Sequence, residues 1–301
     1  MNNDNTSNDG CVNSKTVEEK LDDIICSSVE IRSKVYVNGK YLEHYLNPCL
    51  LLIHRINDFL EDNNVPNHHG VRHVRRVASN GLDLIKSFNI TDVRKISNIV
   101  AACVLHDVDD KKFFHTVDYF NARALLNNSE YHITEIDEII ELITYVSCSG
   151  SHGIDFSKIE NWKLIPRLAD RIEAIGKEGI IRCYQYNQDL KRPLFVNSTP
   201  RVSTEEDVMR NVTQLRYNDY LKFGHSDSMI DHYYDKLLHI VNTSNISFQN
   251  VDNDNTDILH TYHNQSVQFV LFVESVRDNP LNKEIIADYV EKLRIEVDTS
   301  D

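Results

Sequence analysis

Glycine and proline are scarce in this sequence, with nine and six residues respectively among 301. Both residue types mark turns and interrupt helices, so their scarcity favours a helical protein. The sequence also lacks an uninterrupted apolar run near the roughly 18 residues that a membrane-spanning helix needs, and a basic-then-apolar leader at its N-terminus. We therefore expect a soluble protein with no membrane partner.

Closely spaced cysteine pairs are missing as well. The six cysteines include no Cys-x-x-Cys motif, and several lie in apolar helical runs, where a cysteine is typically a buried thiol. This usage suits a reducing, intracellular compartment, and we expect a cytoplasmic protein. The cysteines are Cys11, Cys26, Cys49, Cys103, Cys148 and Cys183.

The sequence has no excess of basic residues. It contains 32 Lys and Arg against 46 Asp and Glu, which gives a formal net charge of −14. Without a polybasic face the protein is not expected to attract nucleic acid, so any contact with a phosphate must come from a few local cations. The length suits one large domain or two small ones, and a homo-oligomer stays open.

Few positions interrupt the helical pattern. Residues 1–28 begin with a stretch rich in Asn, Asp, Ser and Thr and are predicted to form a flexible or poorly ordered tail. Residues 29–185 are predicted to form a helical core that carries the functional site, and residues 186–301 to form helices that pack on the same domain.

Asn38-Gly39 predicts a minor β-hairpin at residues 34–42, and Asn47-Pro48 predicts the start of the next helix. We therefore predict an all-α fold with at most this one hairpin.

The doublet His106-Asp107 follows a strongly apolar helical stretch. The apolar stripe of residues 96–103 continues at helical spacing onto both side chains, which would carry them toward the core. A buried carboxylate without a partner is costly, and a divalent metal ion satisfies an imidazole and a carboxylate together. The alternative is an ordinary helix C-terminus, where a His is favourable, followed by a solvated acidic turn.

Two further polar residues lie at the edges of apolar helical patterns. His73 borders the apolar face predicted for the helix around residues 71–88. Asp170 points well away from the apolar stripe of residues 163–175, at about 100° per residue. Both residues are therefore candidates for the same site as His106-Asp107.

The order His73, His106-Asp107, Asp170 resembles the HD-domain superfamily of metal-dependent phosphohydrolases, whose pattern is His, His-Asp, Asp. Residues 106–113, 169–176 and 228–238 are further similar to a subgroup of small bacterial HD nucleotide pyrophosphatases. The resemblance implies an HD-domain helical fold and one divalent ion held by His73, His106, Asp107 and Asp170. It also implies hydrolysis of a phosphoester or pyrophosphate bond in a nucleotide or a similar small phosphorylated metabolite. His69-Gly70 and the loop at residues 147–161 depart from the subgroup, so the substrate stays open.

The chemistry of these residues also stands without the resemblance. Two imidazoles and two carboxylates form a mixed nitrogen and oxygen site suited to Mn²⁺, Mg²⁺, Fe²⁺, Co²⁺ or Zn²⁺. Such an ion acidifies its water and polarises a phosphoryl group, so Asp107 counts among the catalytic residues as one of its ligands. Asp110, three residues later, is assigned as the general acid or base, with a solvated turn carboxylate as the alternative.

Substrate phosphates need cations, and the motif segments supply Arg72, Arg76, Lys111, Lys112 and Arg171, with a solvated surface position as the alternative for each. The resemblance to the subgroup favours Arg76, Lys112 and Arg171, which lie at its motif positions. His69 precedes His73 by four residues, so it could share the same helix face or touch the substrate.

Two other functions stay open. One is an HD-type oxygenase with two irons, which would require additional ligands. The other is a nucleotide-binding or interaction module that has lost turnover, which Gly70 weakly indicates.

Overall fold

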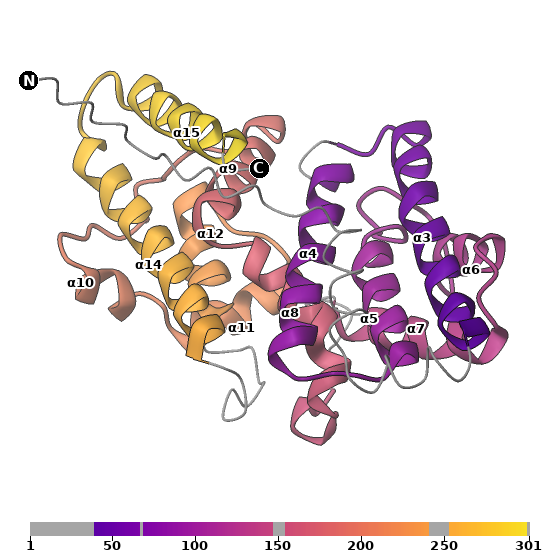
Figure 1. Cartoon of the computed structure of the whole chain (residues 1–301). Helices are drawn as coiled ribbons and strands as arrows, with labels where there is room; N and C mark the ends of the chain where they lie inside the picture. Colours follow the sequence, from indigo (N-terminus) through magenta and orange to yellow (C-terminus); the bar gives the residue numbers. More distant parts are fainter. Residues whose placement is uncertain (1–38, 67–68, 147–153, 241–252, 300–301) are drawn as a thin grey trace, which may run out of the picture.

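The computed structural model describes residues 39–66, 69–146, 154–240 and 253–299. All regular structure within these ranges is helical, comprising twelve α-helices and three short 3-10 helices, and no strand occurs among them. The predicted all-α fold is thus confirmed. Figure 1 shows two halves, with α3 to α8 on one side and α9 to α15 on the other. None of the described helices is long and apolar enough to cross a bilayer.

Helix α5 (Val93–Leu105) is the centre of the first half. All of its residues are buried except Arg94 and Lys95, which is the pattern of a helix enclosed in a core. It contacts α3 (Gly39–Asp62), α4 (Val71–Ser87), α7 (Ile133–Val146) and α8 (Ile165–Glu173), while α6 (Phe120–Asn128) packs on α3 and α7. The short helices η2 (Phe156–Lys158) and η3 (Asn161–Leu164) precede α8.

Helices α4 and α5 lie unusually close at Gly81. A Cβ atom at this position would lie 2.7 Å from the Sγ atom of Cys103, so only glycine fits there without a shift. His73 lies in the first turn of α4, and His106 follows the last residue of α5. The close packing of these two helices therefore helps bring the two histidines together.

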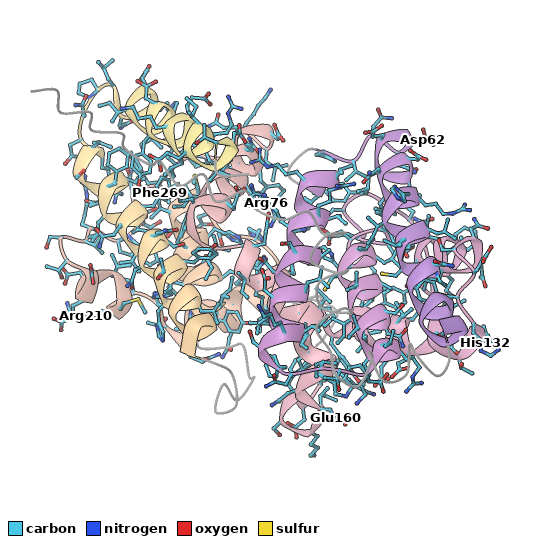
Figure 2. The ribbon with its side chains drawn as sticks, viewed as in Figure 1. Asp62, Arg76, His132, Glu160, Arg210 and Phe269 are labelled. Carbon is cyan, nitrogen blue, oxygen red and sulfur yellow. The ribbon has the colours of Figure 1, made fainter. Side chains whose placement is uncertain are left out.

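The second half packs around aromatic side chains. Tyr233, Tyr234 and Phe269 are almost fully buried, and the rings of Tyr233 and Phe269 are 5.6 Å apart. Figure 2 labels Phe269 within this half. Its elements are α9 (Gly176–Asp189), α10 (Glu205–Arg210), α11 (Gln214–Phe223), α12 (Met229–Asp235), η4 (Leu237–His239), α14 (Asn253–Val276) and α15 (Asn282–Asp298). The boundary expected at residues 185/186 falls inside α9. This helix belongs to the second half, because it packs on α14 and α15. The domain division stays a prediction.

The hairpin predicted at residues 34–42 is wrong where the structure describes it. Gly39 to Leu42 belong to α3, and residues 34–38 lie outside the described ranges. The predicted helix start at Pro48 is also wrong, because α3 runs through this proline. A proline inside a helix costs about 3 kcal/mol, but buried residues such as Cys49, Leu52 and Ile56 hold the following turns in the core. Extending an existing helix is easier than forming an isolated short hairpin.

Candidate metal centre

Five side chains from three helices and their ends converge at one place. His69 precedes α4 and His73 lies in its first turn, His106 and Asp107 follow α5, and Asp170 lies on α8. Two sets of three possible ligand atoms lie within 4.8 Å of one another. The sets are His69, His73 and Asp107, and His73, His106 and Asp170.

Several distances between these atoms are close to those between donors that share one ion. The Nε2 atoms of His73 and His106 are 3.0 Å apart, and Oδ2 of Asp107 lies 3.5 Å from each of them. Oδ1 of Asp170 lies 3.7 Å and 3.6 Å from the same two nitrogens. Donors bound at about 2.1 Å to one ion, at angles of about 90–120°, would be about 3.0–3.6 Å apart.

The partners of the two imidazoles indicate which nitrogen carries the proton. Nδ1 of His106 lies 2.8 Å from the carbonyl oxygen of Cys103, which only accepts hydrogen bonds, so this nitrogen donates. Nδ1 of His73 lies 3.0 Å from the carboxylate of Glu173 without forming a hydrogen bond to it. The two Nε2 atoms face each other at 3.0 Å, and without an ion a proton on one of them forms the hydrogen bond between the rings. A divalent ion bound to both Nε2 atoms would take the place of that proton, so the donor set fits a metal ion.

Burial and charge shift the pKa values of these groups. Burial, reinforced by the charge of Arg182, lowers the pKa of His73 to about 3, which keeps this imidazole neutral. Burial alone would raise the pKa of Asp107, but the neighbouring His106 and His69 outweigh it and hold that pKa well below its usual range. Neutral imidazole and ionised carboxylate are the forms that bind metal ions.

His106 and Asp170 also shift each other's pKa values. Burial would lower the pKa of His106, but the carboxylates of Asp107 and Asp170 raise it above its ordinary value. Burial opposes ionisation of Asp170, and the charge of His106 outweighs it, so the pKa of this carboxyl is lowered. The side chains of His106 and Asp107 are 2% and 15% exposed, which does not fit the alternative of a freely solvated acidic turn.

Sequence reasoning missed two charged residues at this centre, Glu173 and Arg182. Glu173 on α8 forms an ion pair with Arg182 on α9, and its side chain is only 3% exposed. Nη2 of Arg182 lies 3.4 Å from Nε2 of His73, which is the ring nitrogen that also faces His106. The spacing of Glu173, three residues after Asp170, was a signal in the sequence, whereas nothing local singles out Arg182.

His69 joins the cluster that the four predicted ligands form. Its Nδ1 lies 2.7 Å from Oδ2 of Asp107, and its ring packs edge-on against Phe113 at 5.1 Å. The interpretation that His69 shares the His73 helix face is close to the observed arrangement, although His69 lies just before α4.

Asp110 and Lys112 lie in the turn after Asp107. Oδ1 of Asp110 accepts a hydrogen bond from the backbone N–H of Lys112, and Oδ2 lies 3.4 Å from its ammonium group. Lys112 is 53% exposed and Asp110 is 23% exposed. Asp110 thus lies one turn from a cluster residue with its carboxylate partly open to solvent, and its acid or base role stays a prediction.

The two arginines predicted to bind phosphate occupy different environments. Arg76 forms an ion pair with Glu178 of α9, and Figure 2 shows it where the two halves meet. Arg171 follows Asp170 on α8 and is buried, with 3% of its surface exposed. Their roles toward a substrate stay predictions.

Comparison with solved structures defines the class of fold. An HD-superfamily hydrolase from Bacillus thuringiensis superposes with a TM-score of 0.51 at 18% identity, covering 78% of this chain and all of that one. Bacillus subtilis YpgQ in complex with ADP superposes with a TM-score of 0.50 at 16% identity, covering 79% and 97%. A Lactobacillus plantarum protein gives 0.52 at 18% identity, covering 74% and 93%. The chain thus shares the fold of these bacterial proteins, one of which is an HD-superfamily hydrolase, and this confirms the resemblance in fold.

The sequence comparison found one relative at high identity. The uncharacterized protein L803 of Acanthamoeba polyphaga mimivirus is 40% identical over 202 residues, which is 62% of this chain and 80% of the viral protein. The chain belongs to the family of this viral protein. No family model matches it.

Proposed function

We propose that this protein is a metal-dependent phosphohydrolase that cleaves a phosphoester or pyrophosphate bond in a nucleotide or a similar small phosphorylated metabolite. The observation that carries the proposal is the pair of Nε2 atoms of His73 and His106, 3.0 Å apart and flanked by two carboxylates. The HD-superfamily fold supports it. A nucleotide substrate is supported by the ADP complex of the structural neighbour YpgQ.

In this proposal His73, His106, Asp107 and Asp170 hold one divalent ion. Such an ion supplies a water of lowered pKa and polarises the phosphoryl group. The Cys103 carbonyl orients His106 through Nδ1, and the Glu173 carboxylate lies 3.0 Å from Nδ1 of His73, so both imidazoles direct Nε2 toward the cluster. Asp110, partly exposed and one turn beyond Asp107, accepts or returns the proton of the reaction.

Cations at the cluster would bind the phosphates of the substrate. Arg182 lies close to the cluster, with Nη2 3.4 Å from Nε2 of His73, but its charge is compensated by Glu173. Lys112 lies in the turn that follows Asp107, and Arg171 is adjacent to Asp170. We assign phosphate binding to Lys112 and Arg171, and also to Arg76 of α4, whose guanidinium pairs with Glu178 of α9.

A turnover screen tests the proposal. Purified protein would be incubated with nucleoside mono-, di- and triphosphates in the presence of Mn²⁺, Mg²⁺, Co²⁺, Fe²⁺ or Zn²⁺. Separate detection of phosphate and pyrophosphate identifies the bond that is cut. We expect hydrolysis that a chelator abolishes and that the added ion restores. Nucleotide binding without hydrolysis under every ion would instead support a binding module.

His69 favours a second candidate function. Its Nδ1 lies 2.7 Å from Oδ2 of Asp107, so His69 is a fifth possible ligand at the cluster. An HD-type oxygenase with two irons would need such additional ligands. Elemental analysis distinguishes the two functions, because the phosphohydrolase proposal requires one ion per chain and the oxygenase requires two irons.

A further inference from the structure

A cavity of about 580 Å³ adjoins the candidate metal centre. It lies between the C-terminal end of α3, the start of α4 and the residues of α9, and His73, Glu173 and Arg182 are part of its lining. Its volume falls within the range of about 300–1,000 Å³ that small-molecule sites occupy. His73 presents Nε2 to the cluster and is also part of the cavity lining, so the two places adjoin at this side chain.

The walls of this cavity are partly apolar. Ile181 of α9 and Leu60 of α3 are buried, whereas Val65 and Val71 are partly buried at its edge. Aliphatic walls favour the flat or apolar part of a ligand, since burying such a group there removes apolar surface from water.

Charges around the cavity balance each other. Its lining contains three arginines and three glutamates, namely Arg72, Arg182, Arg294, Glu61, Glu173 and Glu178. Arg182 pairs with Glu173, and Arg72 lies 3.9 Å from Glu178. Because these charges offset each other, the cavity offers no surplus positive charge to a phosphate group. The occupant that fits is therefore a neutral group.

Two amide side chains give this cavity a hydrogen-bonding character. Asn64 lies at its rim, and Gln185 of α9 is partly buried in its wall. Within the described ranges, neither side-chain amide has a hydrogen-bond partner, and each offers both donors and an acceptor. A neutral, flat group with a donor and acceptor edge matches both the aliphatic walls and the amide groups of Asn64 and Gln185.

We propose that this cavity binds the nucleobase of a nucleotide whose phosphates lie at the metal centre on the other side of His73. The inference rests on the proposed function and adds the part of the substrate that the cluster itself does not bind. Gln185 reads the edge of the base, and Val71 and Ile181 contact its face. The guanidinium of Arg182 lies between the base and the phosphates.

Non-hydrolysable ligands test this assignment by calorimetric titration of the Mn²⁺-loaded full chain. The probes are methylenediphosphonate, which has no nucleoside, and the α,β-methylene diphosphates of adenosine, guanosine, cytidine and uridine. Val71→Trp fills the mouth of the cavity, and Gln185→Leu removes the amide at similar volume. Gln188→Leu is the matched control, because Gln188 is an exposed residue of the same helix outside the cavity.

We expect at least one nucleoside analogue to bind tenfold or more tightly than methylenediphosphonate. Val71→Trp should remove that advantage, and Gln185→Leu should weaken the preferred analogue about three- to tenfold. Methylenediphosphonate should bind all variants equally, and Gln188→Leu should match the wild type. Circular dichroism of each variant verifies that it is folded. If Val71→Trp does not fold, the affinity of Gln185→Leu for the nucleoside analogues tests whether the cavity binds the base.

The opposite results overturn the inference. If the nucleoside analogues bind no better than methylenediphosphonate, or if folded cavity variants bind them as the wild type does, the cavity is not a base site. The proposed function survives either result as long as methylenediphosphonate binds and the turnover screen is positive. If neither probe binds and no phosphate ester is cleaved, both the proposed function and the cavity assignment fail.

Discussion

Nε2 of His73 and Nε2 of His106 face each other at 3.0 Å in the interior of the protein. The Cys103 carbonyl orients His106 by accepting a hydrogen bond from its Nδ1, and the Glu173 carboxylate lies 3.0 Å from Nδ1 of His73. Both rings therefore keep Nε2 toward the other, where a proton or a metal ion can join them. The two histidines are 33 positions apart in the chain, and the packing of α4 on α5 brings them together.

Replacing Asp107 with Ala should abolish metal retention. This change removes a carboxylate that lies 3.5 Å from both Nε2 atoms, while the helices around it keep their packing. Inductively coupled plasma mass spectrometry of the purified variant should show loss of the stoichiometric metal, with the helical circular dichroism largely unchanged. Asp137→Ala, at an exposed position on α7, should retain the metal. Stoichiometric metal in Asp107→Ala would mean that the ligands lie elsewhere.

Asp110→Asn should separate proton transfer from metal binding. The amide preserves the shape of the side chain but cannot act as a base, so turnover should fall by about 10²–10⁴-fold with the metal retained. His73→Ala should lose metal and turnover together. Metal content and rate constants measured on the same preparations check this, with thermal unfolding as the control for folding. Loss of metal from Asp110→Asn would make Asp110 a ligand, and nearly full activity would point to His69 for the proton.

Lys112→Ala and Arg171→Ala should weaken the binding of the substrate phosphates. A charge-assisted hydrogen bond to a buried phosphate contributes about 1.5–3 kcal/mol, so each loss should weaken apparent affinity roughly ten- to a hundredfold. Steady-state kinetics with the substrate found in the screen measures the effect. Lys222→Ala, at an exposed position in the last turn of α11, is a matched control. Unchanged kinetic constants would remove Lys112 and Arg171 from the site.

Arg182→Gln should destabilise the fold. It removes the guanidinium that pairs with Glu173, whose side chain is 3% exposed, and leaves that carboxylate buried without its cation. Breaking a buried pair in this way costs about 3–5 kcal/mol. Arg210→Gln, whose side chain is 67% exposed, should cost only about 0–1 kcal/mol. Urea unfolding followed by circular dichroism compares the two, and equal midpoints would show that the Glu173–Arg182 pair contributes little.

His232 should make stability depend on pH below neutrality. Burial lowers its pKa well below 6.5 in the folded protein, and the charges of Lys236 and Arg192 act in the same direction. As the pH falls below 6.5, the unfolded chain takes up a proton that the folded one does not. The free energy of unfolding therefore falls with decreasing pH, by up to about 1.4 kcal/mol per pH unit for this one group.

The comparison with a variant isolates this effect. Urea unfolding of the wild type and of His232→Gln at pH 7.5, 6.5 and 5.5 should show a shallower decline for the variant. His225→Gln, at an exposed position in the loop before α12, should decline like the wild type. Parallel curves for the wild type and His232→Gln would show that His232 takes up its proton in the folded state.

The sequence was informative where the signal is local. Periodic apolar residues and the scarcity of glycine and proline predicted an all-α fold, and the helical stripe through residues 96–103 indicated that His106-Asp107 turns inward. The hairpin at residues 34–42 failed because Asn-Gly is a weak signal beside a strong helix whose cooperative growth runs through Gly39 to Leu42. The cost of Pro48 was likewise outweighed by burial, which no local pattern reports.

The sequence by itself determined which residues are candidate metal ligands, because the order His73, His106-Asp107, Asp170 and the apolar stripes around them are properties of the chain. Only the tertiary structure decided their neighbours. It brings Glu173 and Arg182 to His73 from two helices, adds His69 beside Asp107, and pairs Arg76 with Glu178. The physical reason is that helix spacing reaches only a few residues along the chain, whereas ion pairs and a cavity depend on how α4, α8 and α9 pack.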